Sequence, residues 1–379
     1  MHSHNLQYDP RIDQLRWLAA TLVFLFHFQL AYRGIGGPAL SGPWAALVIE
    51  GHTGVGLFFT LSGFVFMQIA QAQQRIGQRI AYREFLRNRV LRIAPLFVTM
   101  FLVATSIGRD SFQPQDVLYL LATNLGHAPT SATEVTGAAW TISLECLFYL
   151  LFPFLARFAL ERGKRYLLKL LALMAFFKLA AYTVNDNSTL MYFCTFVGRF
   201  DQFLIGMLAA MLYRQHQARL KRHAPWLLPC AALLVAADTA ALHLVAPFGA
   251  APKSWAWIFW STVESAGWAA FMLAWVGFRP RLPGALERAL CHGGKVSFSF
   301  YLLHMGLLHL LAQRVGLAHP TGSGWLDVAL MLGLSYGAAW ALATLSYNTI
   351  EEPFLRMRRP YGQERPVQEK AVRPSNTVQ

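Results

Sequence analysis

The sequence predicts an all-α polytopic membrane protein with about ten transmembrane helices and both termini in the cytoplasm. Hydrophobic residues make up 55% of the 379-residue chain, and charged residues make up only 14%. An average soluble protein is roughly 25% charged. In addition, apolar stretches of about 20 residues, the length needed to cross a bilayer, recur from one end of the chain to the other.

The expected spans are the apolar stretches between polar segments, at about 15–33, 52–72, 91–108, 138–158, 166–183, 190–213, 226–246, 255–277, 296–315 and 325–349. Residues 1–355 are therefore expected to form one membrane domain. The polar, proline-containing residues 356–379 are expected to form a disordered cytoplasmic tail. A short outer helix is expected within 109–137, and an interfacial helix within 73–90.

The net charge of +14 is explained by topology rather than by a nucleic-acid partner. If the N-terminus is cytoplasmic, the inner segments hold all but six of the 33 Lys and Arg residues. The exceptions are Arg33, Arg109, Lys253 and Arg314 in outer loops, and Lys178 and Arg199 within spans. This alternation follows the positive-inside rule. The four cysteines have no metal-ligand spacing and form no pair in an outer loop, so neither a metal site nor a disulfide is expected.

The first span, within LRWLAATLVFLFHF, carries Arg16 and His27. Eleven residues return to within about 20° of the same helix face after a rise of roughly 16 Å. The guanidinium would lie at the cytoplasmic rim and the imidazole near the membrane centre, which suits a long cofactor with an anionic end. Histidine is also the natural general base near neutral pH. The alternative is that Arg16 anchors topology and His27 bonds a neighbouring helix.

Two further stretches indicate either ligand contacts or helix packing. GHTGVGLFFTLSGF contains four glycines and Ser62, which allow close helix approach or a broken helix beside a cavity. REFLRNRVLRIAP places Arg89 and Arg92 on one helix face. Arginine side chains bind phosphates bidentately, although a purely topological role is the alternative for this pair.

Other polar residues fall within later spans, where each needs a partner or a function. WTISLECLFYLLFPF and VSFSFYLLHMGLL contribute Trp140, Ser143, Glu145, Ser297, Tyr301 and His304. A structural ion pair between Arg199 and Glu145 is one expectation, and helix packing is the alternative for His304. The roles of Asp238, His243 and Glu264 stay open.

Together these stretches resemble the integral-membrane acyltransferase family 3, whose members O-acylate cell-surface glycans and related acceptors. The resemblance covers nearly all of residues 9–355 and rests on five ordered blocks: RIDQLRWLAATLVFLFH, HTGVGLFFTLSGF, RNRVLRIAP, WTISLECLFYLLFP and SFSFYLLH. Three positions depart from the family pattern. Gly56 stands where the family often has Asp, Met305 where it often has Pro, and Ile12 where it has Leu.

The resemblance implies a membrane-bound O-acyltransferase that uses cytosolic acyl-CoA, most often acetyl-CoA, and holds no permanent cofactor. The roles expected on this basis are catalysis for His27, Arg16 and Glu145; donor binding for Arg89, Arg92, Ser62 and His304; and acceptor binding for Trp140, Ser143, Arg199 and Tyr301. The acceptor would be a glycan or a lipid-linked sugar. Some members append an extracytoplasmic hydrolase-like domain, and this chain is expected to act without one.

The expected location is the bacterial inner membrane, with membrane lipid around the helices. The alternative function is a transporter or exporter of an acylated or small anionic substrate on the same helical body, since intramembrane charges also suit transport. No internal repeat is visible in the sequence, which favours the enzyme. Acetyl or longer acyl transfer, direct transfer or an acyl-His27 intermediate, and the oligomeric state stay open.

Overall fold

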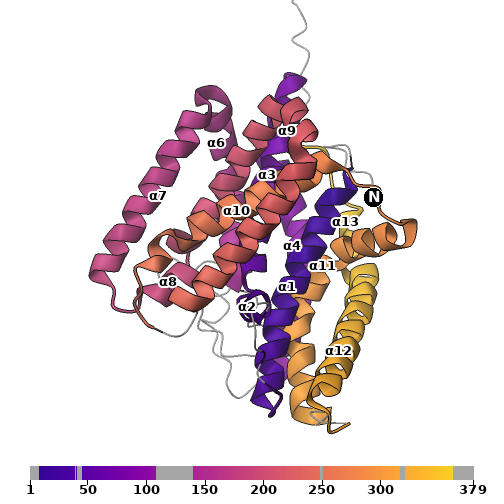
Figure 1. Ribbon diagram of the computed structural model, residues 1–379. Coiled ribbons are helices and arrows are strands. Elements are labelled where there is room, and N and C mark those ends of the chain that lie inside the picture. The colour runs from indigo at the N-terminus through magenta and orange to yellow at the C-terminus, as the bar shows by residue number, and fades with distance from the viewer. Residues whose placement is uncertain are drawn as a thin grey trace, which may run out of the picture.

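The computed structural model describes residues 8–38, 40, 45–107, 140–247, 251–315 and 321–361. Within these ranges the chain is helical and contains no β-strand (Figure 1). The elements are α1 (Pro10–Gly34), α2 (Ala45–Ile49), α3 (Thr53–Arg75), α4 (Tyr82–Ile107), α6 (Trp140–Arg162), α7 (Lys164–Val184), α8 (Ser188–Cys194), α9 (Phe196–Val245), α10 (Ala256–Phe278), α11 (Gly284–Leu310), η2 (Leu311–Val315), α12 (Gly324–Ser346), η3 (Tyr347–Glu351) and α13 (Glu352–Leu355).

Seven helical segments in the described part of the chain are long and apolar enough to cross a membrane: α1, α3, α6, α7, α9, 284–313 and 324–355. This confirms the predicted class, an all-α polytopic membrane protein. The number of ten spans and the cytoplasmic termini stay predictions. The short outer helix expected within 109–137 lies outside the described residues.

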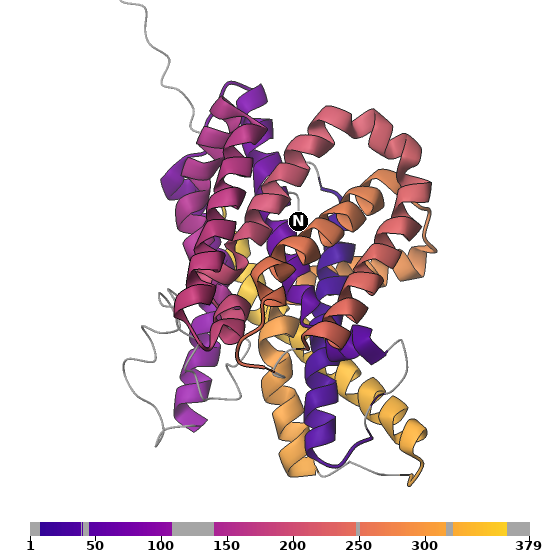
Figure 2. The ribbon, with the colours of Figure 1, turned by 60° about the vertical axis from the view of Figure 1, so that its left-hand side comes forward.

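Helix α9 combines two of the predicted spans, 190–213 and 226–246, in one element of 50 residues. A straight helix of this length would measure roughly 75 Å, far more than the ~30 Å hydrocarbon core of a bilayer. The chain bends instead at His216, where φ is −120° and ψ is 21°. Figure 2 shows the two arms of α9 rising to this bend and descending from it.

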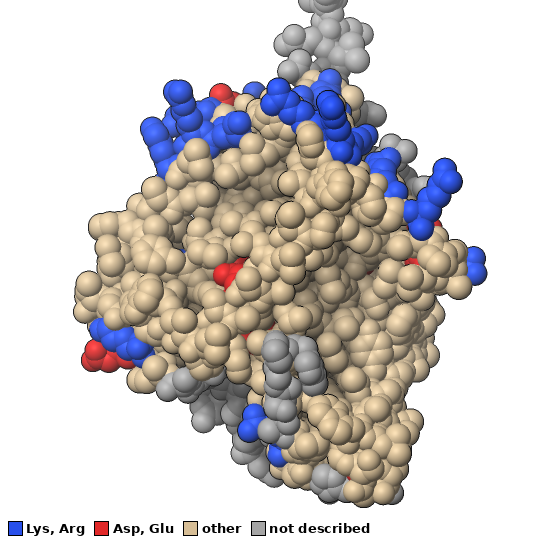
Figure 3. Space-filling model, in the orientation of Figure 1, with Lys and Arg blue, Asp and Glu red and all other residues tan. Residues whose placement is uncertain are grey.

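The outer surface of the helices has the character expected for contact with lipid. Helix α7, at the edge of the molecule in Figure 1, exposes Leu168, Phe176 and Leu179. Figure 3 shows a broad zone almost without charge, while Lys and Arg gather at the upper end, where α6 meets α7 and α9 bends. Since lipid is as apolar as these side chains, their exposure carries no penalty in a membrane.

The interfacial helix expected within 73–90 is wrong. Helix α3 continues to Arg75, residues 76–81 form a short connection, and α4 begins at Tyr82. The apolar residues of this stretch do not share one surface, because Ile76 is exposed whereas Phe85 is fully buried. Helical spacing alone did not reveal the connection between the two helices.

Glycines allow α3 and α9 to pack backbone against backbone. A β-carbon at Gly63 would lie 2.1 Å from the carbonyl oxygen of Phe203, and one at Gly206 would lie 2.0 Å from that of Thr60. Small residues permit such close crossings between membrane helices. Of the two expectations for the glycine-rich stretch 51–64, close helix approach is therefore confirmed, and α3 is unbroken.

Gly56 also lies where a side chain would collide with a neighbour, and here the neighbour is a charged side chain. A β-carbon at this position would lie 2.5 Å from Oε2 of Glu264 on α10. The carboxylate of Glu264 thus occupies the space that any side chain at position 56 would need.

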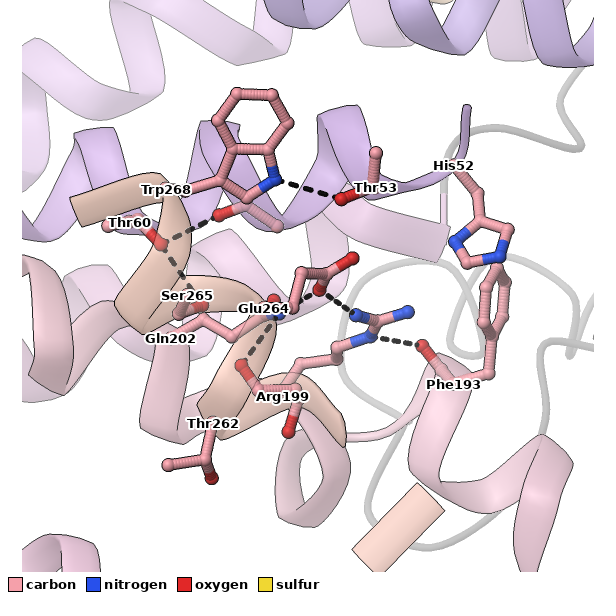
Figure 4. A network of polar contacts seen from close by, with 12 residues as sticks. His52, Thr53, Thr60, Phe193, Arg199, Gln202, Thr262, Glu264, Ser265 and Trp268 are labelled. Carbon is pink, nitrogen blue, oxygen red and sulfur yellow. Dashed lines mark hydrogen bonds and ion pairs between the residues drawn. The ribbon is translucent and has the colours of Figure 1, made fainter. Parts of the chain in front are cut away.

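Glu264 is the centre of a buried polar network (Figure 4). Its Oε2 lies 2.9 Å from Nη1 of Arg199 and accepts a 2.6 Å hydrogen bond from Nε2 of Gln202. Nε of Arg199 donates to the carbonyl oxygen of Phe193 at 2.9 Å. The expected pair between Arg199 and Glu145 is wrong, because α9 turns Arg199 towards α10 instead.

A second buried ion pair joins α9 to α7. Nζ of Lys178 lies 2.7 Å from Oδ2 of Asp201, and it also donates to Oγ of Ser261 on α10. The side chains of both charged residues are 1% exposed. The pair of Lys178 and Asp201 joins α7 to the first arm of α9, and the pair of Arg199 and Glu264 joins α10 to the same arm.

Replacing Gly206 with Ala should destabilise the helix crossing, because the new methyl group meets a backbone oxygen that cannot move independently. We expect a loss of about 1–3 kcal/mol or more, measured as a lower melting temperature of the detergent-solubilised protein. Gly337→Ala is the matched control, since nothing lies within 4 Å of a β-carbon there. Equal melting of both variants would contradict the close crossing.

Replacing Glu264 with Gln should leave Arg199 charged and buried without an anionic partner. Breaking a buried ion pair in this way costs about 3–5 kcal/mol, so the yield and melting temperature of the folded protein should fall. Glu161→Gln breaks an exposed pair with Arg157 on α6 and should change little. If the two variants have the same melting temperature, the ion pair of Glu264 does not stabilise the fold.

Candidate functional site

A cavity of about 780 Å³ lies between α1, α3, α4, α6 and α11, and residues 355–361 close one side of it. Its charged lining is mostly basic. The lining contains Arg16, Arg89, Arg92, Lys295, Arg356, Arg358 and Arg359, together with the acids Asp9, Asp13 and Glu145. Such an excess of positive charge in a concave site attracts anions.

Seven of the polar residues singled out in the sequence line this cavity: Arg16, Ser62, Arg89, Arg92, Glu145, Ser297 and Tyr301. They come from α1, α3, α4, α6 and α11, so the fold brings together residues that are up to 285 positions apart in the sequence. Arg16 and Glu145 each have a partner on their own helix. Nη1 of Arg16 lies 2.8 Å from Oδ1 of Asp13, and Tyr149 donates a 2.5 Å hydrogen bond to Glu145.

The two arginines of α4 are held in place but retain free donors. The guanidinium of Arg89 lies 4.9 Å from the ring centroid of Phe66 and donates to the hydroxyl of Tyr361. Nη1 of Arg92 lies 3.3 Å from Oε2 of Glu351. A guanidinium carries five N–H donors, and these contacts use only part of them. Both side chains can therefore bind an anion in the cavity.

His27, in the C-terminal half of α1, contacts His304 of α11. Their rings are 4.9 Å apart between centroids, and Nδ1 of His27 lies 3.0 Å from Nε2 of His304. No pattern in the sequence indicates this contact, because the two histidines are 277 positions apart.

The carbonyl groups around the two rings determine which nitrogens carry hydrogen. Nδ1 of His304 donates to the carbonyl oxygen of Tyr301 at 2.6 Å, so its Nε2 is an acceptor in the neutral ring. Nδ1 of His27 donates to the carbonyl oxygen of Val23 at 3.0 Å and also faces this acceptor. Nε2 of His27 is then the unprotonated nitrogen, and it is available as a base.

Tyr301 connects the histidine pair to the cavity. Neither His27 nor His304 lines the cavity, whereas Tyr301 does. Its ring lies 5.9 Å from that of His304 between centroids, and its hydroxyl accepts a hydrogen bond from Thr141 at 3.1 Å. Tyr301 also contacts Phe58 of α3 edge-on. The side chain of Tyr301 therefore lies between the cavity and the two histidines.

Three residues expected to bind an acceptor lie away from this cavity. Trp140 is buried and packs against Phe193 at 5.4 Å between ring centroids. Ser143 donates to the carbonyl oxygen of Trp140, and Arg199 belongs to the network around Glu264. Of the residues with open roles, Glu264 holds Arg199 and His243 bonds Glu50 at 3.0 Å.

Sequence reasoning missed the contribution of the C-terminal segment. Arg358 and Tyr361 line the cavity, although 356–379 was expected to form a disordered tail. Residues 356–361 are folded against α4, and 362–379 lie outside the described residues. No local sequence pattern indicates that residues 356–361 pack against α4, because this contact depends on α4 side chains that are far away in sequence.

Taken together, the geometry offers a cavity with a mostly basic charged lining, one residue of which, Tyr301, lies beside a pair of contacting histidines. An elongated molecule with an anionic end and a reactive end would match this arrangement. The positive charges would hold one end, and the other end would lie towards Tyr301 and His27.

Comparison with known proteins agrees with this chemistry. Residues 9–344 match the family described as an acyltransferase domain. The nodulation protein 10 of Rhizobium leguminosarum bv. viciae is 25% identical over 380 residues, which is 94% of this chain and 96% of that protein. The acyltransferase MdmB of Streptomyces mycarofaciens is 25% identical over 395 residues, 94% of each chain.

A shorter match is to the O-acetyltransferase OatA of Staphylococcus aureus (strain NCTC 8325 / PS 47). The identity is 24% over 229 residues, which is 55% of this chain and 35% of OatA. The match thus spans only about a third of that relative's length. No solved structure matches this chain. The family match covers most of the chain and does not favour the transporter alternative. The chain belongs to the family described as an acyltransferase domain, and its long apolar helices are those of a multi-pass membrane protein.

Proposed function

We propose that this protein transfers an acyl group, most simply acetyl, from acyl-CoA to a hydroxyl of a cell-surface or exported carbohydrate. The observation that carries the proposal is the basic cavity that ends beside the His27–His304 pair. The name of one relative, O-acetyltransferase, supports oxygen as the acceptor atom and acetyl as the acyl group.

The donor would enter at the arginine-rich end of the cavity, which we place on the cytosolic side. CoA carries phosphate groups, which arginine forks bind bidentately. Arg89 and Arg92 supply two such forks from one helix face, and Arg16 faces the same cavity. Ser62 adds a hydroxyl to the lining. The acyl thioester would then extend towards Tyr301.

His27 would act as the general base. Its Nε2 removes the proton of the acceptor hydroxyl while the oxygen attacks the thioester carbonyl. The C–O bond forms, the C–S bond breaks, and the CoA thiolate leaves and takes up the proton from His27. The products are an acyl ester and free CoA, so no oxidant or reductant is needed.

His304 would position His27 rather than bind the acyl-CoA donor. Its Nε2 would share Nδ1–H of His27 with the carbonyl oxygen of Val23, and both acceptors keep the opposite nitrogen of His27 unprotonated. When His27 takes up a proton, the same contact stabilises the imidazolium. A carboxylate plays this part in serine hydrolases, and the neutral imidazole of His304 plays it here in an apolar site.

The acceptor side of the proposal rests on the position of the histidines. His27 lies eleven residues beyond Arg16 on the unbroken helix α1, which corresponds to roughly 16 Å along the axis. An acceptor hydroxyl can therefore approach from the side of the bilayer opposite the donor. Because the three relatives come from bacteria, we place the enzyme in the bacterial inner membrane.

Replacing His27 with Ala should lower the rate of acyl transfer by about 100-fold or more, the usual contribution of a general base. The measurement is the amount of base-labile acetyl ester on the surface glycans and lipids of cells that express each variant at matched membrane levels. Undiminished ester formation would exclude His27 as the base.

His304→Ala should also reduce transfer, because the imidazolium of His27 loses the contact with His304 that stabilises it, although the carbonyl oxygen of Val23 still accepts from Nδ1–H. His304→Gln should recover part of the activity, since the side-chain oxygen of Gln can accept from Nδ1–H of His27. If the Ala and Gln variants have equal activity and both are folded, His304 does not act through this hydrogen bond.

Replacing Arg89 and Arg92 together with Ala should mainly raise the apparent KM for acetyl-CoA, because the phosphates lose two bidentate partners. Membrane vesicles supplied with increasing acetyl-CoA provide the measurement. Arg83→Gln is the control, since Arg83 is exposed on the same helix and does not line the cavity. An effect on membrane insertion alone would support a purely topological role for the pair.

A further inference from the structure

Residues 356–361 are bonded to the start of α4 through the main chain. The backbone N–H of Arg359 donates to Oδ1 of Asn88 at 3.0 Å, and Nδ2 of Asn88 donates back to the carbonyl oxygen of Arg359 at 2.6 Å. The N–H of Ala81 donates to the carbonyl oxygen of Tyr361 at 2.8 Å. Asn88 is 1% exposed, so this reciprocal pair is shielded from competing water.

Tyr361 completes the attachment with its side chain. The ring is buried and lies 5.4 Å from that of Phe85 between centroids. Its hydroxyl accepts a hydrogen bond from Nη2 of Arg89. The C-terminal segment therefore orients one of the two arginines proposed to bind the donor.

The same attachment brings Arg358 into the cavity beside other positive charges. Arg358 lines the cavity together with Arg16, Arg89 and Arg92. Burial and the proximity of Arg89 and Arg92 lower the pKa of Arg358 to about 9. Among the described residues, no carboxylate lies within 4.0 Å of its guanidinium, and its buried Nε has no hydrogen-bond partner.

An arginine in this position costs free energy in the empty protein. A partly buried guanidinium loses hydration, and three like charges nearby repel it. Two basic residues that are fully buried in the described part of the chain have carboxylate partners: Lys178 pairs with Asp201, and Arg199 with Glu264. An anionic ligand would supply the partner that Arg358 lacks.

We propose that Arg358 is a fourth phosphate-binding arginine of the donor site, and that residues 356–361 form a wall of this site. The inference rests on the proposed function, because the phosphates are those of acyl-CoA. Arg16, Arg89, Arg92 and Arg358 approach the cavity from three separate parts of the chain. This arrangement suits a donor with several phosphate groups rather than one.

The test is CoA binding to the purified full-length protein in phosphatidylcholine nanodiscs, measured by isothermal titration calorimetry. Arg358→Gln should weaken CoA binding about tenfold or more, the usual effect of losing a hydrogen bond to a charged group. It should also leave the melting temperature of the ligand-free protein unchanged or higher, because one repelling charge is removed. A merely structural role would lower that temperature.

Arg83→Gln serves as the control. It removes an equal charge near the start of α4, the end of the helix to which residues 356–361 are bonded, and it should leave CoA affinity unchanged. Wild-type affinity in Arg358→Gln would overturn the inference. If Arg358→Gln does not fold, Arg358→Lys replaces it in the test: the retained charge without a bidentate fork should weaken CoA binding several-fold, and full affinity would overturn the inference.

The failure of the proposed function would look different. Wild-type protein that binds no CoA would overturn the donor assignment itself. Anionic lipid headgroups share the phosphate chemistry, so the melting temperatures are also compared in nanodiscs that contain phosphatidylglycerol. Stabilisation by that lipid which is lost in Arg358→Gln, with CoA affinity unchanged, would assign Arg358 to a lipid and overturn the inference.

Discussion

A charge within an apolar helical body needs a partner of opposite sign, and this requirement determines how α9 sits in the fold. Arg199 and Asp201 occupy its first turns and bind Glu264 of α10 and Lys178 of α7. With α9 fixed in this way, Gly206 meets α3 at backbone distance. The opposite side of α3 carries Phe58, Ser62 and Phe66 to the cavity. The site is thus built on ion pairs that do not take part in it.

The charges around the cavity differ from those structural pairs. Seven basic residues face three acids there, and Asp13 and Glu351 neutralise Arg16 and Arg92 only in part. Buried pairing thus distinguishes the residues that hold the fold from the basic residues that are proposed to bind the donor. The histidine pair belongs to neither class, because the two imidazole rings contact each other at hydrogen-bond distance.

The sequence predicted those features of the site that lie on a single helix. Arg16 and His27 do share α1, and Arg89 and Arg92 do share one face of α4, because helical periodicity is a local property. The fold class followed from composition and from the length of the apolar stretches.

Contacts between distant segments could not be predicted in the same way. The partner of Arg199 depends on which face α9 turns to α10, and the meeting of His27 with His304 depends on how α1 packs against α11. The return of Tyr361 depends on Asn88 and Phe85, which carry no signal that points to the C-terminal residues. Each of these contacts follows from packing geometry and not from a spacing within one segment.

The close approach of Glu264 to Gly56 has a consequence for comparing this enzyme with its relatives. Gly56 was noted above as a departure from the resembled family pattern, in which an aspartate is frequent, so the sequence alone would suggest a lost acid here. The carboxylate is nevertheless present at that point in space, carried by a helix more than 200 positions later in the sequence. In this chain the residues at positions 56 and 264 thus share one space, so a substitution at either position has to be judged together with the residue at the other.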